Sequence, residues 1–133
     1  MRTQLTRGLA FLLLVLPLGG CGAAALAGAG AATGVYLTSR GAAGVVEGTV
    51  ADLDRRTGTV LAAQNIDVRE RKVAKDRTKI EIKGETAEGD AVKVKIQRKS
   101  PTTSEIKVEV KKDPVAWDQD RARAIVQQIV STN

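Results

Sequence analysis

Three segments in the second half of the chain alternate apolar and charged residues with a period of two. Their apolar members are all β-branched: Ile80, Ile82, Val92, Val94, Ile96, Ile106, Val108 and Val110. Successive side chains of a strand point to opposite faces of a sheet, so each segment predicts a strand with one buried face. Turn residues at 88–90 and 100–102 separate the segments, and connections this short favour an antiparallel meander.

The sequence around these strands predicts two further strands and two helices. Residues 45–50 and 66–72 are rich enough in Val and Ile to form strands. Between 53 and 64 the apolar residues follow a helical period, and Asp52 can cap the start of this helix. Residues 117–131 predict a second amphipathic helix, because their apolar residues also fall on one face.

The expected fold is therefore an α+β two-layer sandwich in the order β-α-β-β-β-β-α. A mostly antiparallel sheet of about five strands would bury one face under two helices and leave the other face in solvent. Residues 45–133 would form this single domain. Trp117, the only tryptophan, would cover the edge of the core, and the alternative is that it stacks against a ligand.

The N-terminal sequence has the features of an export signal. Two arginines accompany a ten-residue apolar run at 9–18, which is shorter than the roughly 20 residues that span a bilayer. The small residues Gly19 and Gly20 follow, and then comes Cys21, the only cysteine. This pattern predicts a signal peptide over residues 1–20.

Leu18-Gly19-Gly20-Cys21 resembles the lipobox of bacterial lipoproteins. In that family the cysteine thiol receives a diacylglycerol, the signal is cut before the cysteine, and the new amino terminus is usually acylated. The resemblance implies that Cys21 begins the mature chain and anchors it to a membrane. In that family an aspartate directly after the cysteine usually retains the protein in the inner membrane, and here that position is Gly22. The resemblance therefore also implies the inner leaflet of the outer membrane in a two-membrane organism, facing the periplasm.

Two other interpretations of the N-terminal region stay open. Cys21 could be a buried structural thiol, or residues 8–39 could form an uncleaved membrane helix, which Pro17 and several glycines would weaken. If Cys21 is lipidated, the Ala/Gly-rich residues 21–44 predict a tether that spans roughly 25 Å. Within it, residues 35–37 could form a short strand or make a first contact with the domain.

The layout of the mature chain resembles a family of small, uncharacterised Gram-negative lipoproteins. Short echoes of that family are Ala51-Asp52-Leu53-Asp54 at the first helix and Ala87-Glu88-Gly89-Asp90 in a hairpin turn. The sequence departs from the family at 114–118, where a glycine-rich turn would be expected. The family implies no activity for this chain.

The composition argues against most catalytic chemistry. With no histidine and a single cysteine, the common zinc sites and a serine–histidine triad are excluded. No pair of carboxylates and no glycine-rich phosphate loop stands out. We therefore expect no catalytic residues, no metal, no cofactor and no enzymatic activity. Nucleic acid is not an expected partner, because stacking aromatics are scarce.

The predicted outer face of the sheet is strongly basic. Its lysines are Lys79, Lys83, Lys93, Lys95, Lys107 and Lys111. Against Glu81 and Glu109 these six lysines leave a net charge of +4. Such a face could dock an anionic partner, such as lipid phosphates, peptidoglycan carboxylates or an acidic protein. The simpler interpretation is a solvated face whose lysines prevent pairing with other strands.

These observations favour a non-enzymatic envelope module for binding or scaffolding. The alternative is a carrier that holds a small apolar or lipid ligand between helices and sheet, where Gly58, Ala62, Ala63 and Ala122 could leave a cavity. An enzyme would require a pocket with converging carboxylates.

Overall fold

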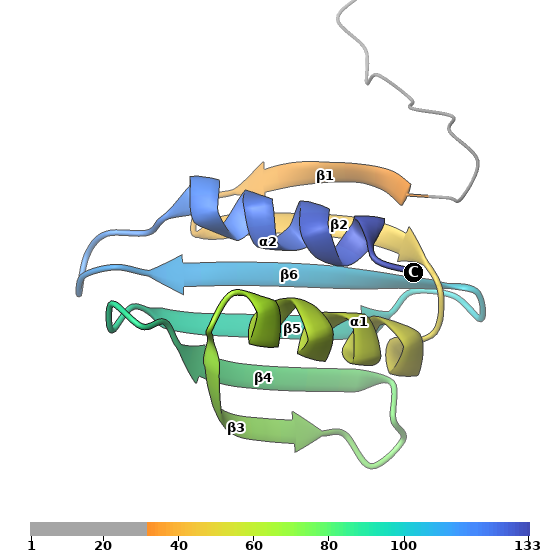
Figure 1. Cartoon of the computed structure of the whole chain (residues 1–133). Coiled ribbons are helices and arrows are strands. Elements are labelled where there is room, and N and C mark those ends of the chain that lie inside the picture. Colours follow the sequence, from red (N-terminus) through yellow and green to blue (C-terminus); the bar gives the residue numbers. More distant parts are fainter. Residues whose placement is uncertain (1–31) are drawn as a thin grey trace, which may run out of the picture.

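The computed structural model describes residues 32–133, which form a six-stranded antiparallel sheet with two helices (Figure 1). In chain order the elements are β1 (Ala32–Thr38), β2 (Gly41–Glu47), α1 (Val50–Ala63), β3 (Asp67–Val73), β4 (Lys79–Glu85), β5 (Ala91–Arg98), β6 (Thr103–Lys111) and α2 (Gln119–Ser131). Across the sheet the strands lie in the order β1-β2-β6-β5-β4-β3, so β1 and β3 are the two edges.

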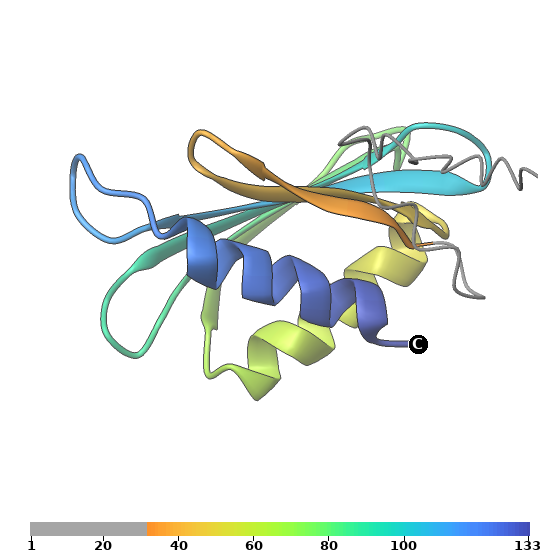
Figure 2. The ribbon, with the colours of Figure 1, turned by 90° about the horizontal axis from the view of Figure 1, so that it is seen from above.

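Both helices cover the same face of the sheet. Seen from above, they lie beneath one side of the twisted sheet, and no helix of residues 32–133 lies on the other side (Figure 2). Helix α2 contacts β1, β2 and β6, whereas α1 contacts β3 to β6 and also packs against α2. The α+β two-layer sandwich predicted from the sequence is confirmed.

The core lies between the helices and the sheet. The three alternating segments are β4, β5 and β6, as predicted, and every apolar residue of their inward rows is at most 5 % exposed. They meet apolar residues of both helices, of which Leu53, Ile125 and Ile129 are fully buried. Burial of such side chains contributes roughly 1.5–3 kcal/mol each, which makes this face of the sheet the main source of stability.

The sheet begins earlier than the sequence indicated. Residues 32–44 were expected to belong to a tether, but they form β1 and most of β2, so the sheet has six strands and not five. Their small residues serve close packing. A Cβ atom on Gly41 would lie 2.0 Å from the carbonyl oxygen of Val108, and one on Gly44 would lie 3.3 Å from a methyl group of Val126 in α2.

The helix starts are set by side chains that cap them. Thr49, not Asp52, is the N-cap of α1, and its Oγ1 accepts a hydrogen bond from the Asp52 amide at 3.2 Å. The Asp52 carboxylate in turn accepts a hydrogen bond from the Thr49 amide, which completes a capping box. Helix α2 starts two residues later than predicted, because Asp118 is its N-cap and accepts from the Arg121 amide at 2.9 Å.

Several predictions concern residues outside the described part of the chain. The signal peptide over 1–20, its cleavage residues Leu18, Gly19 and Gly20, and the lipidated Cys21 all lie there. Of the helices within 32–133, neither has the length and apolar character needed to cross a membrane.

Candidate functional site

The sheet face opposite the helices, which we call the open face, is the candidate site (Figure 2). The structure brings all six predicted lysines together there, because each alternates with an inward apolar residue of β4, β5 or β6: Lys79, Lys83, Lys93, Lys95, Lys107 and Lys111. In the sheet register Lys83 lies opposite Lys93, and Lys95 lies opposite Lys107. Like charges placed directly opposite each other are destabilising unless carboxylates compensate them.

Carboxylates compensate half of these lysines. Lys93 Nζ lies 3.1 Å from Glu81, and Lys107 Nζ lies 3.2 Å from Glu109. Lys83 is paired with Glu70 of β3.

In the described part of the chain, the other three lysines (Lys79, Lys95 and Lys111) have no carboxylate oxygen within 4.0 Å. These three give the open face its uncompensated positive charge.

Glu70 of β3 is a member of the open face that the sequence did not indicate. Its carboxylate lies 2.8 Å from both Lys72 Nζ and Lys83 Nζ. Hydrogen bonds from Lys72 and Lys83 lower the pKa of Glu70 to about 2, and the same contact raises the pKa of Lys83. The period of β3 is hidden in the sequence by an irregularity in register between Val68 and Glu70.

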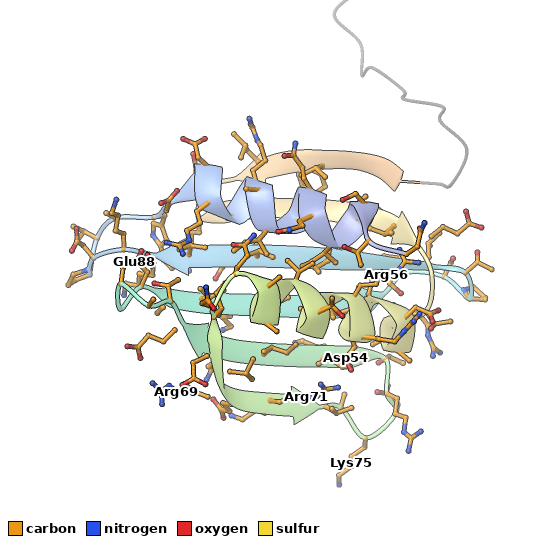
Figure 3. All side chains as sticks on the ribbon, viewed as in Figure 1. Asp54, Arg56, Arg69, Arg71, Lys75 and Glu88 are labelled. Carbon is orange, nitrogen blue, oxygen red and sulfur yellow. The ribbon has the colours of Figure 1, made fainter. Side chains whose placement is uncertain are left out.

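The basic residues of β3 and of the turn after it do not all join the open face. These residues are Arg69, Arg71, Lys72, Lys75 and Arg77. Arg71 lies on the helix side of β3 and pairs with Asp54 of α1. The two labelled side chains lie between α1 and the edge strand (Figure 3). Arg69 pairs with its neighbour Asp67 at 3.2 Å. The basic character of β3 therefore serves partly to hold α1 against the sheet edge.

Strand β1 contributes an aromatic residue to the open face. The Tyr36 hydroxyl donates a hydrogen bond to Glu105 Oε1 at 2.7 Å, and Lys99 Nζ lies 2.6 Å from the same carboxylate. Lys99, and then Tyr36, lower the pKa of Glu105, and the bond to Glu105 raises the pKa of Tyr36. This contact ties the edge strand to β6 across β2.

The sequence suggested that Trp117 covers the edge of the core. In the structure it lies on the open face instead. A tight turn closes behind β6, where the Lys112 amide donates to the Ala116 carbonyl at 3.1 Å, and it places Trp117 in a bridge beside Lys111. The Arg40 guanidinium lies 5.5 Å from the ring centroid and Lys111 Nζ lies 5.9 Å from it. Both distances fit cation–π contacts.

A hollow of about 200 Å³ opens on the open face beside Trp117. It is lined by Lys83, Gly84, Ala91, Val92, Lys93, Glu109, Lys111 and Trp117. A second hollow, of about 210 Å³, lies beside Val73 at the β3 edge. The sequence does not indicate the first hollow, because its lining residues come from three strands and a turn that no motif connects.

The small residues expected to leave a cavity between helices and sheet lie elsewhere. Gly58, Ala62 and Ala63 are exposed on the solvent side of α1. Only Ala122 faces the core, where it is fully buried. Three of the four residues therefore do not supply space for a ligand under the helices.

The titratable groups of residues 32–133 show no metal-binding arrangement. No three His, Cys, Asp or Glu side chains within this range converge as possible ligands. The lysines give the open face positive charge, and Tyr36 and Trp117 give it aromatic surface.

Fold and site together define a class of small α+β sandwich proteins with a lysine-bearing sheet face that neither helix of the described residues covers. Over residues 5–132 the chain matches the family described as a protein of unknown function (DUF3568), and it belongs to that family. Membership of a family of unknown function, expected from the layout of the elements, is thus confirmed, whereas the lipoprotein character expected with it stays a prediction. No curated protein matches the chain.

Proposed function

We propose that this protein is a lipid-anchored protein of the bacterial envelope whose domain is a non-enzymatic binding or scaffolding module. Cys21 would carry the acyl chains, palmitate among them, in the inner leaflet of the outer membrane. The domain from residue 32 onward would face the periplasm and meet an anionic envelope component or protein.

Support for the anchor comes from the sequence Leu18-Gly19-Gly20-Cys21 after a short apolar run. A single acyl chain binds membranes only marginally, at about 0.8 kcal/mol per buried methylene, so stable anchoring needs more than one chain. The diacylglycerol and N-acyl group of a lipoprotein cysteine meet this requirement on one residue.

The observation that carries the binding role is the open face itself. A sheet needs cover on one face only, and here both helices lie on that one face. The open face keeps three lysines without a carboxylate partner among the described residues, namely Lys79, Lys95 and Lys111. Their field would attract an anionic surface, and salt would weaken that attraction.

The anchor is tested by the variant Cys21→Ser. Cells that express the wild-type chain should incorporate labelled palmitate into it, and the protein should sediment with membranes and resist extraction by high salt. Cys21→Ser should incorporate no label and leave the membrane fraction, whereas Lys95→Gln, which alters only the open face, should behave as wild type. Palmitate label in Cys21→Ser would show that the anchor lies elsewhere.

The binding role is tested by photocrosslinking in intact cells from two exposed positions. A crosslinker at Lys95 on the open face should capture an envelope partner, and the yield should fall steeply as salt rises from low to physiological concentration. The matched position is Arg123, exposed on α2 on the opposite side of the molecule. Equal capture from both positions, or capture that salt does not change, would contradict an electrostatic open-face interaction.

A further inference from the structure

The hollow beside Trp117 arises from one row of side chains across the sheet. In the register Glu85, Ala91, Lys111 and Trp117 are successive neighbours. Ala91 has by far the shortest side chain of this row and is exposed, which leaves space between the long side chains around it. The Trp117 ring and the aliphatic stems of the lysines supply apolar walls to that space.

The charges that line the hollow leave one cation uncompensated. Lys83 and Lys93 are paired with Glu70 and Glu81, respectively. Glu109 is paired with Lys107. Lys111 has no carboxylate within 4.0 Å among the described residues and lies over the Trp117 ring. A ligand that complements this hollow therefore carries one negative charge near Lys111 and a flat surface for Trp117.

The volume sets an upper limit to the ligand. A cavity of about 150 Å³ holds benzene, and pockets for drug-sized ligands begin at about 300 Å³. The hollow of about 200 Å³ lies between these values, so it accommodates a single ring.

We propose that the hollow formed by Ala91, Lys111 and Trp117 binds a small monocarboxylate that carries one flat ring. The ring lies against the Trp117 indole, and the carboxylate accepts a charge-assisted hydrogen bond from the Lys111 ammonium. This inference rests on the proposed binding role of the open face and names a ligand class for it.

Trp117 makes the test direct, because it is the only tryptophan of the chain. The full protein, purified from cells and held in lipid nanodiscs, would be titrated with benzoate while the tryptophan fluorescence is recorded. Benzamide has the same ring without the charge, and acetate has the charge without the ring. Benzoate should give a saturable change with an affinity roughly tenfold or more above either probe, which corresponds to one charge-assisted hydrogen bond.

Two variants separate shape from charge. Ala91→Leu fills the hollow and leaves Lys111 and Trp117 in place, whereas Lys111→Gln removes the cation and leaves the space. Each should weaken benzoate binding by roughly tenfold or more. Arg123→Gln removes an exposed cation of α2 on the opposite side of the molecule and should bind benzoate as the wild type does. Circular dichroism and thermal unfolding would confirm that each variant is folded.

The inference is overturned if folded wild-type protein shows no saturable response to benzoate, or if benzamide binds equally well. Full affinity in either folded variant, Ala91→Leu or Lys111→Gln, would overturn it too. The fluorescence change is independent of the membrane anchor. Failure to bind benzoate in a palmitate-labelled protein thus contradicts this inference alone, and benzoate binding by an unacylated chain contradicts only the anchor.

Discussion

Glu70 of the edge strand β3 contacts one lysine of its own strand and one lysine of β4 through a single carboxylate. It lies 2.8 Å from Lys72 and from Lys83, and these two ammonium groups lower its pKa to about 2, against 4.5 for an ordinary glutamate. Because the folded protein holds the charged form, the stabilisation is fully present above pH 4.5. It is lost as the pH falls toward 2, where the carboxylate becomes protonated in the folded state too.

The variant Glu70→Gln tests this contribution. Between pH 4.5 and 2 its free energy of unfolding should fall less steeply with decreasing pH than that of the wild type, since one linked protonation is gone. Urea unfolding at a series of pH values measures the slope. Lys75→Gln removes a nearby exposed cation without an ion pair among the described residues and should keep the wild-type slope. An unchanged slope in Glu70→Gln would contradict the assignment.

For single residues, the sequence predicts which face of a strand a side chain occupies better than it predicts which other residues that side chain contacts. The six lysines of the open face follow from the period of two, because alternation alone decides which side of a strand a residue occupies. Glu70 and Trp117 do not follow from it. The first depends on an irregularity in β3, and the second on a turn that brings residue 117 back beside Lys111.

The strands differ in how clearly the sequence indicates them, because their inward residues differ in size. Strands β4, β5 and β6 bury large β-branched residues on one face, so their pattern is visible in the sequence. In β2 two of the inward positions, 42 and 44, carry small residues, and an Ala/Gly-rich segment shows no period even when it is a strand. Ala42 is fully buried and Gly44 lies under Val126, which requires small side chains because α2 packs closely there.

The same substitution at two glycines should have opposite effects. Gly41→Ala places a methyl group against the Val108 carbonyl, and overpacking of this kind costs about 1–3 kcal/mol. Gly58→Ala adds a methyl group on the exposed side of α1, where nothing lies within 4 Å, and should stabilise by about 0.5–1 kcal/mol. Urea unfolding of both variants gives the comparison. Equal effects of the two would show that β2 does not approach β6 as described.

For the whole molecule, the extent of the domain determines which fragments fold. A chain of residues 32–133 keeps every strand, whereas a chain of 45–133 lacks β1 and begins within β2. The shorter chain leaves part of the α2 contact surface bare and removes the Tyr36–Glu105 bond. We expect cooperative urea unfolding for 32–133 and none for 45–133. Equal unfolding midpoints would instead support the domain boundary at 45 that the sequence indicated.

The most direct test of the lipid-anchored account is the mass of the native polypeptide purified from its own membranes. The account predicts that the chain begins at Cys21 and that its N-terminal peptide carries the mass of a diacylglycerol thioether and an amide-linked acyl chain. A native polypeptide that begins at Met1 and carries an unmodified thiol at Cys21 would contradict it.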